Sequence, residues 1–201
     1  MLVFLIYNGI GFSQNKLQKQ LSAAHITSIS INGNQIFNIS ISTSKTDDIM
    51  VLSTLDGEYQ HQFQVVVKEV NNTLNLSLEQ VSLAAIQDDK RNAHKIIAAT
   101  LHLKIPEQLI VHLLSDIGSV QLDGVFNELH VQLLQGQCRI KGEVKKATIN
   151  TLDGDIMVVT NNATVEAVSH HGSLTLDTFS ESNSIWNLKS INGNITVVKL
   201  D

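Results

Sequence analysis

Two carboxylates flank a glycine in the string LDGDI, at Asp153 and Asp155. Carboxylate oxygens gathered on one turn could bind Ca²⁺, which takes about six to eight oxygen ligands. The positions 18 residues away include Gln135, Gln137 and His171, so carboxylates do not recur in register. We therefore expect Asp153, Asp155 and His171 to be solvated polar surface residues, and we expect no metal or other cofactor. Calcium at the Asp153–Asp155 turn stays open as the alternative.

The pair His170–His171 and the single cysteine, Cys138, are further groups that could bind a metal or act as a nucleophile. Adjacent residues of a strand point to opposite faces, so the two histidines cannot easily bind one ion. Cys138 has no partner for an internal disulfide. No feature of the sequence supplies the geometry that would activate it as a thiolate, and we expect a buried structural thiol.

Clustered carboxylates on the outside of a β-helix would instead indicate an enzyme that cleaves sugars. Asp123 and Asp177 occupy the same position of an 18-residue repeat, three repeats apart. At strand spacing that separates them by about 14 Å, more than the roughly 5 to 9.5 Å of a glycosidase pair. The sequence also has no glycine-rich phosphate loop and no serine nucleophile elbow. We expect no enzyme, and a carbohydrate-active lyase or hydrolase is the alternative.

Composition excludes some partners and suggests a cell compartment. The net charge is −5 and there is no block of Lys or Arg, so a nucleic-acid partner is not expected. Residues 1–14, MLVFLIYNGIGFSQ, resemble the apolar and cleavage regions of a signal peptide, although the usual basic start is missing and the true start residue is open. No transmembrane segment is expected. The protein is predicted to be exported, to the periplasm, the outer membrane or the cell surface.

A repeat is the strongest structural signal in the chain. Glycines recur every 18 residues at Gly118, Gly136, Gly154 and Gly172, and Gly193 follows after 21. Apolar residues stand two and four positions after each glycine, which is the alternation of a strand with one buried face. The predicted core positions are Val120, Leu122, Ile140, Ile156, Val158, Leu174, Leu176, Ile195 and Val197.

This spacing predicts an all-β fold. Stacked coils place equivalent residues of successive units in register, so we expect a short single-stranded β-solenoid, or β-helix, with 18-residue coils over residues 107–201. The glycines are expected at turns that need positive φ. Leu134, Leu152 and Ile191, two residues before a glycine, are expected to form a further apolar column of the interior.

Residues 15–106 lack the 18-residue interval and are expected to form a β-sheet cap, continuous with the solenoid as one structural unit. The string SINGN at residues 30–34 is expected to turn a hairpin of this cap, whereas its second copy at 190–194 belongs to the last coil. Asn71–Asn72 predicts a second hairpin. Residues 84–94 are predicted to form a polar loop, and a strand is predicted to end at Pro106.

The layout resembles the putative-adhesin family of exported β-solenoid proteins, also described as adhesin-like or autotransporter-head-like domains of the Bacteroidetes type. The resemblance rests on the export signal, SISINGNQIFNIS, DGEY, NNTL, the strand that closes with Ile105 and Pro106, and the later strings DGDIMV and NGNITV. It covers essentially the whole mature chain. It implies an exported, non-enzymatic β-helical protein and transfers no catalytic residue.

The function expected from the sequence is therefore an adhesin-like binding or structural module of the cell envelope. Its ligand is unidentified, with a glycan or an envelope protein as the two classes considered. An envelope-stress or assembly factor that acts through protein partners is a further alternative.

Overall fold

The structure, a computed structural model, describes residues 15–57, 60–81, 98–180 and 182–200. Its strands come from segments in which Ile, Val or Leu alternate with polar residues, because such a segment buries one face and leaves the other in water. The strands join one 15-stranded sheet around a single core. The predicted signal peptide at 1–14 and the predicted loop at 84–94 lie outside the described residues.

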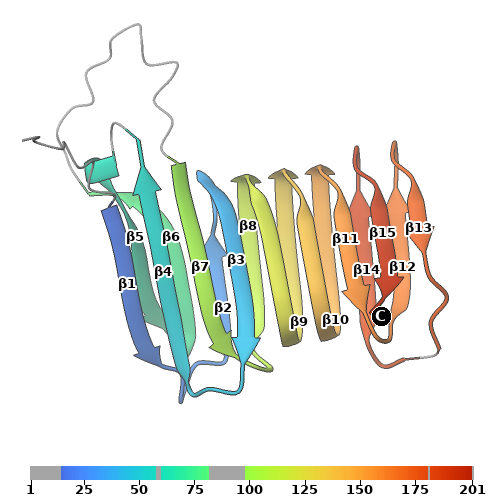
Figure 1. Cartoon of the computed structure of the whole chain (residues 1–201), viewed down its shortest axis with the longest axis horizontal. Helices are drawn as coiled ribbons and strands as arrows, with labels where there is room; N and C mark the ends of the chain where they lie inside the picture. The colour runs from blue at the N-terminus through green and yellow to red at the C-terminus, as the bar shows by residue number, and fades with distance from the viewer. Residues whose placement is uncertain (1–14, 58–59, 82–97, 181, 201) are drawn as a thin grey trace, which may run out of the picture.

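The sheet is folded into two walls that face each other across the core (Figure 1). The first wall has the order β1 (Asn15–Ser22), β4 (Asp48–Asp56), β7 (Ala98–Pro106), β3 (Ile36–Ser44), β9 (Ser119–Gln135), β10 (Cys138–Asp153), β11 (Ile156–Thr160), β15 (Ile195–Lys199) and β13 (Leu174–Leu176). The second wall has the order β5 (Phe63–Val70), β6 (Thr73–Gln80), β2 (Ser28–Asn32), β8 (Ile110–Ile117), then β9 and β10, then β14 (Ile185–Ser190) and β12 (Thr164–Ser169). A short 3₁₀ helix, η1 (Gln60–Gln62), precedes β5.

The long strands β9 and β10 belong to both walls and join them along one side. The first part of β9, through Asp123, pairs with β3, and the part from Glu128 onward pairs with β8. Gly124 lies between these parts with a φ of +128°, and Gly142 repeats the bend in β10 with a φ of +133°. Side chains disfavour such φ values, so glycine allows each strand to pass from one wall to the other.

The predicted fold class is right in being all-β and wrong in its architecture. The expected single-stranded β-solenoid requires coils that stack in chain order, but the strands form one nearly closed, barrel-like sheet with a different order. Strand β15 lies between β11 and β13, and β14 lies between β10 and β12. Antiparallel pairs also enter the same sheet, at β1–β4, β4–β7 and β5–β6.

The 18-residue interval correctly predicts the register of three neighbouring strands, but it does not predict the whole strand order. Val120 pairs with Cys138, and Cys138 pairs with Ile156, all in parallel. The interval does not predict which strands come next. After β13, at the edge of the sheet, the chain returns inward to β14, so its last two strands enter between earlier ones.

The first copy of SINGN does not turn a hairpin. Strands β2 and β3, on either side of it, make no pair with each other. Instead β2 pairs in parallel with β8, and β3 pairs in parallel with β9. The Asn71–Asn72 hairpin is confirmed, since β5 and β6 pair antiparallel and both asparagines have positive φ, 49° and 62°. The strand that was expected to end at Pro106 is β7, which does end there.

Most predicted core residues lie fully inside, and two do not. Val120, Leu122, Ile140, Ile156, Val158, Ile195 and Val197 are at most 2% exposed. Leu174 and Leu176 are instead 46% and 43% exposed. Their strand, β13, is the last of the first wall, so no described strand covers its outer side.

Positive φ, expected at all five turn glycines, occurs at Gly118 and Gly136. Gly154, Gly172 and Gly193 are required for a different reason. A Cβ atom at Gly154 would overlap the carbonyl oxygen of Gly136, one at Gly193 would overlap that of Gly154, and one at Gly172 would overlap that of Gly193. The glycines form a stack in which each backbone lies directly against the next.

Candidate binding surface

The polar residues singled out in the sequence lie on the surface and do not form a site. The carboxylate of Asp155 accepts a hydrogen bond from the backbone N–H of Asn194 at 2.7 Å, so it links two turns. Asp153 is exposed. His171 Nδ1 lies 2.8 Å from Asn192 Oδ1. Within the described ranges, no three His, Cys, Asp or Glu side chains come together as metal ligands.

The Asp123–Asp177 pair is even further apart than the chain order predicts. From Asp123 the register runs through Lys141, Val159 and Val198 before it reaches Asp177. Four strand spacings are about 19 Å, because β15 is inserted between β11 and β13. The Asp177 carboxylate accepts a hydrogen bond from the backbone N–H of Lys199 at 2.8 Å. These two carboxylates cannot act on one glycosidic bond.

Cys138 lies inside the core, 0% exposed, between Val120 and Ile156. Burial raises the pKa of its thiol to about 12, because the apolar surroundings disfavour the thiolate. The thiolate is the reactive form of cysteine, so this residue has neither the access nor the charge state of a nucleophile.

We expect Cys138 to react with a thiol reagent only when the protein unfolds. In native buffer at neutral pH, Ellman's reagent should release almost no colour over hours, whereas in concentrated guanidinium chloride one thiol should react within minutes. The chain has one cysteine, so the signal reports this site alone. Rapid labelling of the native protein, at a rate close to that in denaturant, would show that Cys138 is accessible.

Hydroxyl side chains on the inner face hold the glycine turns of the second wall. Thr151 Oγ1 donates to the carbonyl of Gly154 at 2.7 Å, and the N–H of Gly193 donates to Ser190 Oγ at 2.8 Å. Ser169 makes the same kind of contact, since its Oγ donates to the Gly193 carbonyl at 2.7 Å. With these hydroxyls turned inward, the residue that follows each of them must point outward.

Those outward residues form an exposed aliphatic surface. Leu134, Leu152 and Ile191 lie side by side on β9, on β10 and just after β14, and Leu114 of β8 lies next to them. Their exposed fractions are 53%, 46%, 37% and 48%. We call these four residues the apolar row. They line a shallow depression of about 370 Å³ together with polar residues that include Lys189 and His170.

The expectation that Leu134, Leu152 and Ile191 belong to the interior is therefore wrong. Strict alternation from the buried Leu129 and Val131 places Leu133 inward, at 3% exposed, and Leu134 outward. Counting in steps of two from these residues would have identified the row in the sequence.

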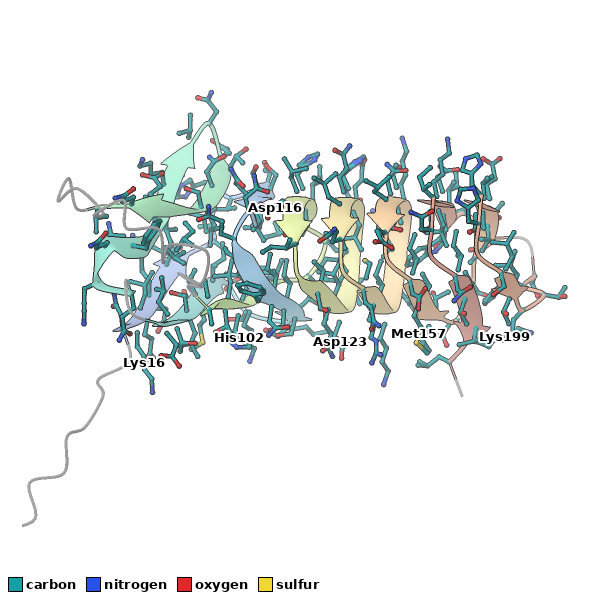
Figure 2. The ribbon with its side chains drawn as sticks, turned by 90° about the horizontal axis from the view of Figure 1, so that it is seen from above. Lys16, His102, Asp116, Asp123, Met157 and Lys199 are labelled. Carbon is teal, nitrogen blue, oxygen red and sulfur yellow. The ribbon has the colours of Figure 1, made fainter. Side chains whose placement is uncertain are left out.

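The apolar row runs along the side of the molecule that carries Asp116, opposite to the side of His102 and Met157 (Figure 2). Across the strands, Asp116 of β8 lies next to Leu134 at one end of the row, and His170 lies next to Ile191 at the other end. The row is thus an aliphatic strip across the strands with a carboxylate at one end and an imidazole at the other.

A stacked pair of imidazoles lies on the same wall. The rings of His112 and His130, on paired strands, have centroids 4.8 Å apart and planes within 9° of parallel. Partial burial and the neighbouring His130 both lower the pKa of His112. The lowered pKa favours the neutral ring of His112 at neutral pH.

The first wall carries a second, more polar depression of about 630 Å³. Its lining comes from β7, β3, β9 and β10 and includes Asn38, His102, Gln121 and Arg139. The guanidinium of Arg139 donates to Gln137 Oε1 at 3.2 Å. This area offers hydrogen-bond donors and acceptors and has no apolar row.

No helix in the described part of the chain has the length and apolar character that a membrane span requires. No protein-family model and no curated protein matches the sequence.

Solved structures do resemble this one. A putative cell adhesion protein from Clostridium sporogenes superposes with a TM-score of 0.66 at 13% identity, over 94% of this chain and 100% of that one. A putative adhesin from Bacteroides fragilis gives a TM-score of 0.41 at 14% identity, over 96% and 100%. The first comparison establishes a shared fold. In fold, this chain is similar to a protein described as a putative cell adhesion protein, in agreement with the family resemblance of its sequence.

Proposed function

We propose that the protein is an exported, non-catalytic, adhesin-like binding module of the cell envelope, and that it binds a protein partner through the apolar row. The apolar row carries this proposal. Soluble proteins rarely leave aliphatic side chains together on one face, and where they do the patch marks a contact site. Leu114, Leu134, Leu152 and Ile191 are between 37% and 53% exposed, although each lies on or beside a well-paired strand.

Three further observations support a binding role. The candidate catalytic carboxylates are separated or engaged in turns, and the single thiol is buried. The pattern of residues 1–14 supports export. The fold is shared with a protein whose name refers to cell adhesion.

A glycan is the second candidate ligand, on the evidence of the polar depression of the first wall. Arg139, His102 and the amides around them could hydrogen-bond sugar hydroxyls. The apolar row favours a protein, because aliphatic side chains gain most from contact with another apolar surface.

Paired variants test the proposal. Leu152→Asp places a charge in the middle of the apolar row, whereas Met157→Asp places one at a similarly exposed position, 40% against 46%, on the other wall. Both should fold, which circular dichroism checks. We expect immobilised wild-type protein and Met157→Asp to retain the same envelope proteins from cell extract, and Leu152→Asp to lose them.

Equal retention by all three proteins would remove the apolar row from the proposal. Binding on a glycan array that Arg139→Ala abolishes and Leu152→Asp leaves unchanged would transfer the function to the polar depression. Release of sugar products from envelope polysaccharide by the wild type would favour the enzyme alternative.

A further inference from the structure

The two ends of the sheet differ in how their edge strands are protected. At one end the edges are β1 and β5, and at the other they are β13 and β12 (Figure 1). An unprotected edge presents free N–H and C=O groups to any other strand, and a charged side chain on the inner face is a common protection.

The β1–β5 end carries such charges. Lys19 of β1 stands opposite the buried Val51, so it lies on the inner face of the first wall. Glu69 of β5 stands opposite the buried Leu74, on the inner face of the second wall, and its carboxylate lies 2.7 Å from His25 Nε2. Another strand stacked on either edge would have to bury one of these charges, which is costly.

The inner positions of the two edge strands at the β12–β13 end carry no charge. Lys199, one strand further in on β15, pairs with the buried Thr160, and its Nζ lies 6.0 Å from the ring centroid of Phe179. The inner positions of β12 hold Val165 and Ala167, and those of β13 hold Leu174 and Leu176. Their partners one strand inward, Trp186, Leu188, Ile195 and Val197, are 0% exposed. Leu174 and Leu176 continue the same inner rows but are 46% and 43% exposed. Phe179, which follows β13, is partly buried and packs against the core. The core thus ends here in an apolar cross-section that is covered only in part, which we call the open end.

We propose that the open end is a self-association surface, on which a second copy of this chain docks end to end to form a closed dimer. The occupant follows from geometry. The open end has two strand edges, one on each wall, with apolar core between them, and packed walls are about 10 Å apart. A single added peptide strand would cover one edge and leave the other edge and the core exposed. A second copy presents the same two edges at the same separation, so it covers both strand edges and the apolar core between them.

A two-fold axis across the open end makes this contact self-complementary. The axis reverses the direction of each strand, so β13 meets its copy antiparallel, and β12 meets its copy in the same way. Leu174 and Leu176 of one protomer then face those of its partner. Because the other end is protected by Lys19 and Glu69, the assembly closes at two copies and does not grow into a filament.

The open end is a different surface from the apolar row, so this inference does not rest on the proposed function. The contact spans two strands and the core between them, which is small for a protein interface, and we expect reversible association. Sedimentation velocity and light scattering over a concentration series, up to about 1 mM, should show the 22.1 kDa chain exchanging with a species of twice that mass.

A matched pair of lysine variants tests the surface. Leu176→Lys puts on β13 the inward charge that Lys19 puts on β1, at a position already 43% exposed. Thr175→Lys adds the same charge one residue away, on the outer face of the same strand. We expect Leu176→Lys to weaken dimerisation at least tenfold and Thr175→Lys to leave it near the wild-type value. Ala167→Lys, on β12, is the second inward variant if Leu176→Lys fails to fold.

A wild-type protein that stays at 22.1 kDa across the whole series would overturn the inference. So would a dimer that persists in both Leu176→Lys and Ala167→Lys, or equal weakening by Thr175→Lys. Species larger than a dimer would overturn the closed two-fold arrangement.

Discussion

Replacing Ile156 with aspartate should leave no folded protein. Ile156 is 0% exposed on β11, between Cys138 on one side and Ile195 on the other. Neither neighbour can pair with a carboxylate, so the charge would be buried without a partner. The penalty, more than about 5 kcal/mol, is comparable with the whole free energy of unfolding of a domain. Circular dichroism and thermal melting of Ile156→Asp should show no cooperative transition.

Met157→Asp is the control for this result. Met157 is the next residue of the same strand and points to the outside, with 40% of its surface exposed (Figure 2). The same aspartate there should change the melting temperature by only a few degrees, because surface substitutions are usually within about 0.5 kcal/mol. Similar melting of Ile156→Asp and the wild type would show that the inner and outer faces of β11 are assigned the wrong way round.

Replacing Gly154 with alanine should be nearly as damaging, although it adds one methyl group. The Cβ atom would overlap the carbonyl oxygen of Gly136, which is backbone and cannot rotate away. To relieve that overlap the two backbones must move apart. This movement would break the 3.0 Å hydrogen bond that the Gly136 N–H donates to the Asp153 carbonyl. We expect a loss of more than about 4 kcal/mol, well beyond an ordinary glycine-to-alanine change.

Asp153→Ala is the control for this variant. It separates the steric overlap at Gly154 from the effect of changing any residue in the turn. Asp153 precedes Gly154 in the same turn, and it is exposed. Chemical denaturation should therefore give a free energy of unfolding for Asp153→Ala within about 1 kcal/mol of the wild type. Were Gly154→Ala to denature at the same guanidinium concentration as Asp153→Ala, the close stacking of the glycines would play no part in stability.

The sequence predicts the strands well here, because a strand with one buried face shows apolar and polar residues in alternation over a few positions. The alternation around Ile156 and Val158 and the Asn71–Asn72 turn both identify features that the structure contains. The same patterns predict the parallel register of Val120 with Cys138, because equal intervals between equivalent residues keep their side chains on one face.

The order of the strands could not be predicted in this way. Repeated strands of similar pattern can stack in more than one order, and the choice depends on how completely each one fills the core. Strand β14 contributes Trp186 and Leu188 to the inner positions, whereas β12 offers Val165 and Ala167 at the paired positions. The larger side chains gain more from full burial, which favours β14 next to β10 and leaves β12 outside.

The candidate surface was missed for a related reason. Leu134 and Leu152 form a column of apolar residues, and such a column predicts an interior position. Their neighbours Leu133 and Thr151 occupy the inward positions, and one of those is a hydroxyl residue that was not expected inside. Thr151 is accommodated because its Oγ1 donates to the Gly154 carbonyl, which composition alone does not reveal.

The insertion of β14 and β15 between earlier strands has a consequence for the order of events during synthesis. As the ribosome releases the chain, β12 and β13 emerge before the strands to which they pair, β14 and β15. From β8 to β11 each new strand pairs with the one made just before it, and β12 is the strand at which this order stops. The segment at residues 164–176 must wait, unpaired, until residues 185–199 have been made, and those later strands enter the sheet ahead of it. We therefore expect the two segments to dock together rather than one after the other.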